Sequence, residues 1–294
     1  MSSVAAFLHA WSPILAPFFT IATLITCIII TKVNDTYVGT LSWPYFSDMG
    51  RGMFFLVSSS RVLTTSPPDV PAAYVFAIGL CLTAIFLALT WFFNYTYQKT
   101  VLAHPSTKGA SSAALPRCSL AVCIMGMIST IGLPILSIYR VSFAHPEIHN
   151  YAAYFFFVFQ AAAVLLNTYV TRRLLVIHQS LDADAPPFKL DSLRRAWRFQ
   201  IAFAVAFSIA FLLYIPVGLA IVCDWARLTI QKCIENGLGV DYCQQTIRLD
   251  DVNTKLYDYG NCWGINQMRA AAQLACILTL VGYAFSFRGQ SADM

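Results

Sequence analysis

A hydrolytic site could combine Ser47 or Ser58 with His149 and Asp48. A serine whose proton is taken by a histidine, which an acid orients, is the arrangement of the serine hydrolases. The chain contains no G-x-S-x-G turn to present such a serine. A second expectation for the stretch WPYFSDMGRG is a turn fixed by Pro44 and Gly50, in which Ser47 and Asp48 bond neighbouring backbone groups. The sequence favours the turn over the catalyst.

The stretch HPEIHN, residues 145–150, carries two histidines four positions apart. That spacing would suit metal ligands on one face of a helix, but a proline stands between them. The His-Glu-x-x-His order of a zinc protease helix is absent. We therefore expect no metal and no other cofactor. The expected role of His149 is to cap the helix that follows, next to a belt of aromatic residues.

These residues must be positioned by membrane helices, because the chain is too apolar for a soluble domain. It has 294 residues, 58% of them hydrophobic and 11% charged, against roughly 25% charged in soluble domains. A helix needs about 20 apolar residues to cross a bilayer. We predict an all-α polytopic membrane protein, a single domain (1–294) that is a bundle of six transmembrane helices at residues 12–31, 71–94, 117–138, 150–171, 199–222 and 267–287.

The charges between the spans predict the orientation. Lys and Arg are concentrated after the second and fourth spans, so these loops and both termini are expected in the cytoplasm. The loops 32–70 and 223–266 then lie outside. Clustered basic residues beside a membrane attract anionic lipid, although ordinary topology-setting charge is the alternative. The basic residues between the fourth and fifth spans are Arg172, Arg173, Lys189, Arg194, Arg195 and Arg198.

Two features of the outer loops are typical of chains exposed outside the cytoplasm: a group of cysteines and a glycosylation acceptor. Four of the nine cysteines, Cys223, Cys233, Cys243 and Cys262, belong to the long loop between the last two spans. Two disulfides are expected there, with three pairings open and free thiols as the alternative. Asn34 begins an Asn-x-Thr acceptor for glycosylation, but it lies so close to the first span that an unmodified turn residue is the stronger expectation.

The motif and the histidine are expected to meet at the outer face. WPYFSDMGRG follows the first span, and His149 and Asn150 begin the fourth, so both lie at the outer ends of helices. Together with Tyr45 and Arg140 they could line a groove for a lipid head group. This groove is the binding site that we expect.

Two motifs resemble those of a known group of multi-pass membrane proteins. After the first span, residues 44–50 match a pattern Pro-Tyr-Ile-Ser-Asp-x-Gly, with Phe for Ile. The span SLAVCIMGMISTIGLPILSIYR is similar to the third span of the same group and is followed by Ile-His-Asn. This is the Frag/DRAM/Sfk family, which is related to the N-terminal region of a fungal cell-wall protein that remodels GPI anchors. The residues that carry the resemblance are Pro44, Tyr45, Ser47, Asp48, Gly50, His149 and Asn150.

The chain departs from the family pattern in two places. The proline pair that usually follows the glycine within a few residues comes only at residues 67–68. Where family members often begin the last span with an acidic residue and Trp, this chain has Asn266, Gln267, Met268 and Arg269.

The resemblance implies an integral membrane protein without an established catalytic centre. Family roles include modulation of autophagy, support of phosphoinositide signalling and lipid asymmetry, and remodelling of GPI-anchor lipids. We expect a non-enzymatic regulator linked to membrane lipid homeostasis. A GPI-anchor lipid remodelling factor is the alternative, and a transporter of lipid or small molecules is the third. The expected partners are membrane lipids, including anionic phospholipids, and a membrane protein, but not nucleic acid. The plasma membrane, lysosome or vacuole, and Golgi or endoplasmic reticulum all remain open.

Overall fold

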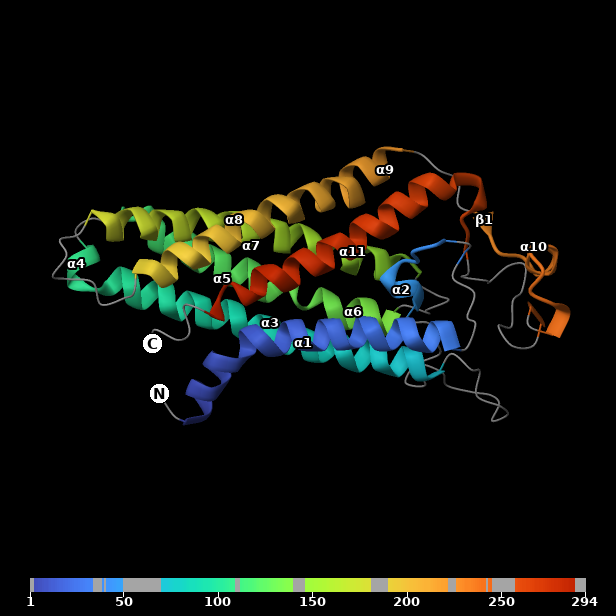
Figure 1. Ribbon diagram of the computed structural model, residues 1–294, viewed down its shortest axis with the longest axis horizontal. Coiled ribbons are helices and arrows are strands. Elements are labelled where there is room, and N and C mark those ends of the chain that lie inside the picture. Colours follow the sequence, from blue (N-terminus) through green and yellow to red (C-terminus); the bar gives the residue numbers. More distant parts are fainter. Residues whose placement is uncertain are drawn as a thin grey trace.

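Long helices make up most of the described part of the molecule (Figure 1). The computed structural model describes residues 3–33, 39, 41–49, 70–108, 112–139, 146–180, 190–221, 226–241, 243, 244 and 257–288. Within these ranges, six helical segments are long and apolar enough to cross a membrane, which confirms the predicted all-α class and the predicted number of spans. Several residues of the expected sites lie outside the described residues: Asn34, Gly50, Ser58, Arg140, Lys189 and Cys223.

The first three spans are α1, α3 and the pair α5 and α6. Helix α1 (Ser3–Val33) contains Pro13 and Pro17. Helix α3 (Val70–Ala103) follows the motif, and a short helix α4 (Pro105–Lys108) comes after it. The third span is broken after α5 (Ala114–Ser129) and continues as α6 (Gly132–Ile138). The close approach of α6 to α7 explains its initial glycine, since a Cβ at Gly132 would lie 2.6 Å from the Ala152 carbonyl oxygen.

The last three spans are α7, the α8 series and α11. Helix α7 (Pro146–Gln179) is followed by α8 (Leu190–Leu212), which continues through a π-helical turn η3 (Leu213–Val217) into α9 (Gly218–Ala220). Pro216 lies in the π-helical turn, where the helix is already widened. Helix α11 (Trp263–Phe285) is preceded by a 3-10 turn η5 (Gly260–Cys262).

The helices extend beyond the apolar spans that the sequence predicts. The second span was expected to end at residue 94, but α3 continues to Ala103 because Tyr97, Gln98 and Val101 are buried against neighbouring helices. The fourth was expected at 150–171, but α7 covers Pro146–Gln179. Hydropathy locates the stretch that lies in hydrocarbon, whereas packing decides how far the helix continues beyond it.

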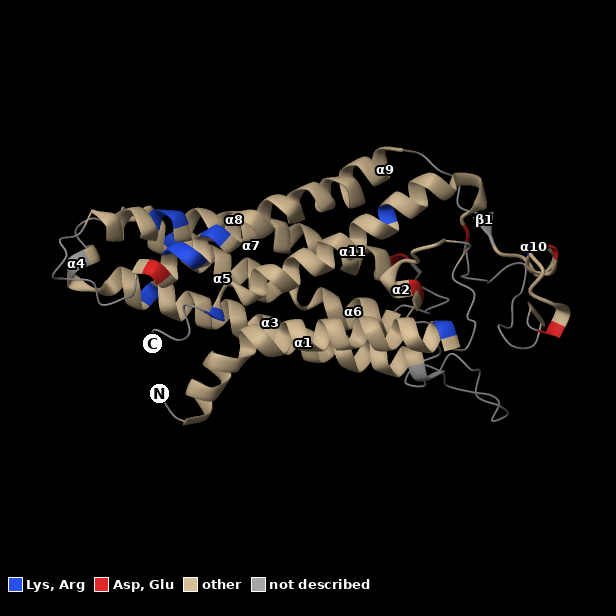
Figure 2. Cartoon of the chain, in the orientation of Figure 1, with Lys and Arg blue, Asp and Glu red and all other residues tan. Residues whose placement is uncertain are grey.

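The six spans pack as a ring of antiparallel neighbours. Helix α1 packs against α3 and α11, α3 against α5 and α6, α7 against α5, α6 and α8, and α8 against α11. In Figure 1, α1 begins and α11 ends toward the same side of the molecule. We call this side the basic end, because Figure 2 shows Lys and Arg gathered toward it on α7 and α8. The opposite side, where α2 lies, is called the motif end.

Asn167 faces the interior of the bundle and is fully buried. Its side-chain oxygen accepts hydrogen bonds from Asn94 Nδ2 and Gln98 Nε2, both at 2.8 Å, and its Nδ2 donates to Tyr283 Oη at 2.9 Å. Ser119 Oγ donates to Gln98 Oε1 at 2.6 Å. Asn167 therefore joins α3, α5, α7 and α11 through a buried hydrogen-bond network.

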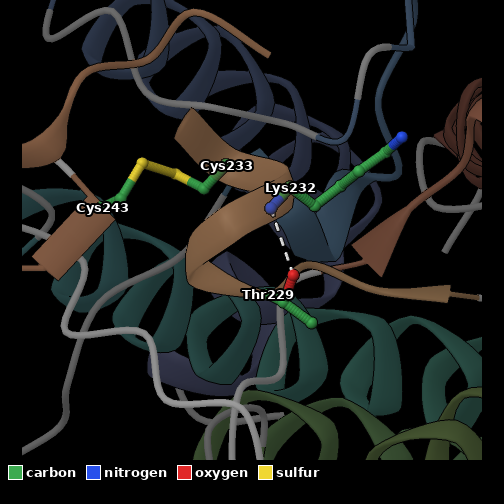
Figure 3. The surroundings of a disulfide bond; sticks show 4 residues. All are labelled: Thr229, Lys232, Cys233 and Cys243. Carbon is green, nitrogen blue, oxygen red and sulfur yellow. Dashed lines mark hydrogen bonds between the residues drawn. A yellow bond between two sulfur atoms is a disulfide. The ribbon is translucent and has the colours of Figure 1, made fainter. Parts of the chain in front are cut away.

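A small subdomain follows the fifth span. A two-residue strand, β1 (Ala226–Arg227), pairs antiparallel with β2 (Tyr257–Asp258), and helix α10 (Ile230–Glu235) lies between them in the sequence. Figure 3 shows Thr229 capping α10, with its hydroxyl accepting from the Lys232 backbone N–H at 3.1 Å. The same figure shows the disulfide between Cys233 and Cys243, whose side chains are buried. Cys262 is also disulfide-bonded.

The disulfide is expected to stabilise this subdomain alone. Replacing Cys233 and Cys243 together by alanine removes a restraint on a short loop, and such a restraint acts mainly on the unfolded chain. We expect trypsin to cleave at Lys232 faster than in the wild type, while the thermal unfolding temperature of the bundle stays unchanged. The wild type treated with reductant should be cleaved at least as fast as the variant, because reductant opens this disulfide and also that of Cys262. Equal cleavage rates in the oxidised wild type and the variant would contradict the prediction.

Candidate functional site

The motif forms a short helical turn at the motif end. Helix α2 (Phe46–Met49) begins after Tyr45, whose carbonyl accepts from the Asp48 and Met49 amides at 2.9 and 3.3 Å. Thr31 Oγ1, near the end of α1, donates to the Met49 carbonyl at 3.0 Å. The predicted turn is therefore a one-turn helix attached to α1, and Phe46 and Met49 are buried beneath it.

Gln267 of α11 docks the segment that leads into this turn. Its Oε1 accepts from the Ser42 and Trp43 amides at 2.8 and 3.3 Å, and its Nε2 donates to the Trp43 carbonyl at 3.2 Å. The Gln267 carboxamide thus accepts from backbone N–H groups and donates to a backbone carbonyl, as the backbone of a neighbouring strand would. The start of the last span fixes the position of the motif.

Gln273, two turns further along α11, makes a second connection. It is buried, and its Oε1 accepts from the Phe46 backbone N–H at 2.9 Å. Its Nε2 lies 3.0 Å from the hydroxyl oxygen of Tyr214, to which it donates. The first N–H of α2 has no partner within its own helix, so Gln273 supplies one. This residue joins the motif, the last span and the π-helical turn of the fifth.

Tyr45 and Asp48 are held by aromatic and polar neighbours. The Tyr45 hydroxyl donates to Asn266 Oδ1 at 3.2 Å, and the Tyr259 hydroxyl donates to Asp48 Oδ2 at 3.1 Å. The two tyrosine rings pack with centroids 5.7 Å apart. Burial raises the pKa of the Tyr45 phenol, Arg269 opposes the rise, and Asp48 adds to it. The phenol therefore keeps its proton and remains a donor.

His149 lies in the first turn of α7, and its ring holds α6. Its Nδ1 is 2.7 Å from the Leu136 carbonyl oxygen. A carbonyl only accepts, so Nδ1 carries the proton in this contact. Asn150, the next residue along α7, is exposed. The histidine therefore connects α6 and α7 at the motif end. It lies within the first turn of α7, which begins at Pro146, and not at the cap position that the sequence predicts.

A cavity lies beneath the motif, among the helices. It has about 730 Å³ of space free of protein atoms, a volume that includes the part open to the outside. Ser47 and His149 both lie on its wall, so the structure brings the motif and the histidine to one place. The other lining residues come from α1, α2, α3, α6, α7 and α11: Ala16, Pro17, Thr20, Phe46, Phe76, Leu80, Thr83, Leu87, Leu133, Leu136, Ala153, Phe156, Phe157, Gln273, Ile277, Leu280, Val281 and Ala284.

The residues of the expected lipid-contact cluster lie at the opposite end. Arg194 lies 3.6 Å from Asp191, one turn earlier on α8, and the Arg172 guanidinium of α7 stacks 4.8 Å from the Trp197 ring centroid. Arg173, Arg195 and Arg198 are placed on the same two helices. The basic cluster is thus separate from the motif and its cavity. Within the described residues, no group of three His, Cys, Asp or Glu side chains is arranged to hold a metal ion.

Sequence reasoning missed the residues of α11 that complete this site. Asn266, Gln267 and Gln273 dock the motif, and the first two lie where the chain departs from the pattern of the family that it resembles. The signal was present, because polar side chains in an apolar span are costly unless they face a partner. The sequence could not show that their partners are in the motif segment, because these partners lie more than 220 positions away along the chain.

A comparison of the sequence with models of known families identifies the family of this chain. The model described as Frag1/DRAM/Sfk1/Cwh43P N-terminal domain matches residues 9–288. The chain belongs to this family. No match was found among the curated proteins or among the solved structures. The matched range includes the motif, His149, all six spans and the α11 residues that dock the motif, so the site lies within the Frag1/DRAM/Sfk1/Cwh43P N-terminal domain.

Proposed function

We propose that this family member is a non-enzymatic membrane regulator of lipid homeostasis, which binds a lipid at the motif end. The observation that carries the proposal is the cavity whose wall includes both Ser47 and His149. It places polar groups beside a mostly apolar space inside a membrane bundle. A lipid offers the same combination of a polar head and an apolar body.

The hydrogen bonds of the motif support binding rather than catalysis. In a serine hydrolase triad, the acid accepts the Nδ1 proton of the histidine. Here His149 Nδ1 donates to the Leu136 carbonyl, and Asp48 accepts from Tyr259. The two side chains that would orient and activate a serine thus hold elements of the fold together. The role we assign to His149 is to position α6 and α7 around the cavity.

A pair of substitutions at His149 tests this role. Asparagine can place an N–H donor toward the Leu136 carbonyl, as Nδ1 does, but has no imidazole, whereas leucine has no donor at all. We expect His149→Asn to restore normal membrane lipid composition in cells that lack the protein, and His149→Leu to fail. Mass spectrometry of total membrane lipids is the measurement, with protein amount and location checked for both variants. Equal loss of function in both, with normal folding, would favour an imidazole that takes part in chemistry.

The second candidate is a GPI-anchor lipid remodelling factor. The shared cavity wall of Ser47 and His149 is the observation that favours it, because a serine and a histidine beside a lipid site could act on an ester. Normal GPI-anchor lipids in cells lacking the protein would eliminate this candidate. A change in those lipids that His149→Asn does not rescue would favour it over the regulator.

The distribution of charge and disulfides supports the orientation that we propose. The basic end, where Lys and Arg gather on α7 and α8 (Figure 2), faces the cytoplasm, and the motif end faces outside or the lumen of an organelle. Disulfides persist in such compartments, and the one between Cys233 and Cys243 lies in the subdomain that extends from the motif end (Figure 1). Both termini are then cytoplasmic. The plasma membrane, lysosome or vacuole, and secretory pathway all fit this arrangement.

The basic end is proposed to contact anionic phospholipid. Each basic residue near a membrane surface contributes about 1 kcal/mol to the attraction. Replacing Arg194, Arg195 and Arg198 together by glutamine should weaken binding of phosphoinositide by roughly 100-fold, measured with the full chain in nanodiscs of stated lipid composition. Lys232→Gln, an exposed charge of the small subdomain, is the matched control and should change nothing. Unchanged binding by the triple variant would contradict the proposal.

A further inference from the structure

We propose that the cavity receives one acyl chain of a phospholipid, inserted between the helices with the head group at the motif end. This inference rests on the proposed function and specifies which part of the lipid the protein selects. The cavity would then select the lipid by the length of its acyl chain as well as by its head group. The dimensions, lining and floor of the cavity each support this occupant.

The cavity is long and follows the helix axes. On α3 its lining runs from Phe76 to Leu87, and on α11 from Gln273 to Ala284. Each pair is separated by eleven positions, which at 1.5 Å per residue gives a depth of about 16 Å. One leaflet of the hydrocarbon core is about 15 Å thick, half of the full core. The cavity is therefore as deep as one acyl chain of one leaflet is long.

The lining is polar at one end and apolar along its length. Ser47 and His149 lie at the motif end, and Gln273 lies next to α2. Deeper in the cavity the polar side chains are Thr20 and Thr83, whose hydroxyls lie 3.3 Å apart, and Thr20 also donates to the Ala16 carbonyl. Their polar atoms are thus occupied, and the deep part presents alkyl and aromatic surface to an occupant.

An aromatic cluster lies beyond the other end of the cavity. Trp91 lies one turn beyond Leu87 on α3, and Tyr283 directly precedes Ala284 on α11. The Trp91 ring packs against Phe287 with centroids 5.4 Å apart and against Tyr283 at 6.3 Å. All three side chains are buried. A chain that entered from the motif end would meet this cluster, so the arrangement suits a bound chain with a fixed end and not a path through the membrane.

The fit of the chain, rather than apolarity as such, is what can give selectivity here. The surrounding bilayer is as apolar as the cavity, so moving a chain between the two changes little hydrophobic energy. An unfilled space, however, loses the van der Waals contacts of the atoms that line it. A chain that reaches the floor restores these contacts. A chain that is too short leaves part of the space empty, and a longer one must leave carbons outside.

Substitutions at the floor test the inference in both directions. Ala284→Leu on α11 and Ala16→Leu on α1 fill the deep end from two walls, and Leu87→Ala enlarges it. The matched controls are Ala271→Leu and Ala10→Leu, which add the same side chain at exposed positions of the same two helices. The measurement is the chain length and amount of phospholipid that co-purifies with the full chain, determined by mass spectrometry after washing with a fixed excess of detergent.

We expect about one phospholipid per chain in the wild type and in both controls. The filling variants should lose the phospholipid, or retain species with shorter acyl chains that are enriched several-fold over the wild type. Leu87→Ala should retain species with longer chains. Recovery of only free fatty acid or detergent, or an unchanged lipid in all three floor variants, would overturn the inference. The enlarging variant keeps the test decisive if a filling variant does not fold. If floor variants leave the bound lipid unchanged while His149→Leu still disturbs cellular lipids, this inference fails and the proposed function stands.

Discussion

Replacing Asn167 by leucine is expected to lower the free energy of unfolding by about 2 kcal/mol, because three hydrogen bonds are lost and bonds within membranes average about 0.6 kcal/mol each. The side chain is fully buried and joins Asn94 and Gln98 of α3 to Tyr283 of α11. Leucine has a similar volume but leaves these three groups without their shared partner. The measurement is unfolding of the purified protein in detergent micelles.

The control for this prediction is a polar residue of α3 that stays within its own helix. The Thr96 hydroxyl donates to the carbonyls of Phe92 and Phe93. We expect Thr96→Val to change stability little, since a β-branched residue of the same shape replaces it and no other helix loses a bond. If Asn167→Leu were as stable as Thr96→Val, the network would not hold the bundle together as we describe.

Replacing Gln273 by leucine is expected to cost about 3 kcal/mol and to loosen the motif. Two buried groups, the Phe46 N–H and the Tyr214 hydroxyl, lose their partner, and each unsatisfied buried group costs about 1–3 kcal/mol. Since the lost contact to Phe46 is the one that ties α2 to this part of α11, the variant should also retain less lipid. Stability and co-purified phospholipid are both measured on the same preparation.

Gln231→Leu is the matched control for Gln273→Leu. Gln231 lies on the exposed helix α10, where its Nε2 bonds Glu235 one turn away at 3.0 Å. A pair of this kind on a surface helix contributes only a few tenths of a kcal/mol, roughly 0.2–0.5. The control should therefore match the wild type in both measurements. A Gln273→Leu variant that keeps both its stability and its lipid would show that the motif does not depend on α11.

The number of spans could be predicted because the bilayer restricts the backbone. Only a helix satisfies its own backbone hydrogen bonds in hydrocarbon, so each long apolar stretch predicts one span. The same reasoning predicted that the motif and His149 lie at one end. It could not predict how far α3 and α7 continue, because those ends are set by buried residues such as Tyr97 rather than by hydropathy.

The site was only partly predictable, because its key contacts join distant parts of the chain. Gln267 and Gln273 could be seen as polar residues of an apolar span, but nothing local says that they meet Trp43 and Phe46. The cavity was still less predictable from the sequence, because it forms where small side chains such as Ala284 meet across several helices. The pairing of Cys233 with Cys243 was one of three possibilities that spacing left open.

The most direct test of the account asks where a lipid chain lies in the folded protein. The probe is a phospholipid with a photoreactive diazirine at the end of one acyl chain, incorporated into nanodiscs with the full-length wild type, and the labelled residues are mapped by mass spectrometry. We predict labelling of the cavity floor, at Leu87 of α3 and Ala284 of α11, with loss of this labelling in Ala284→Leu. Labelling confined to Ile85 and Phe285, which lie on the exposed faces of the same helices, would contradict a lipid-binding cavity beneath the motif.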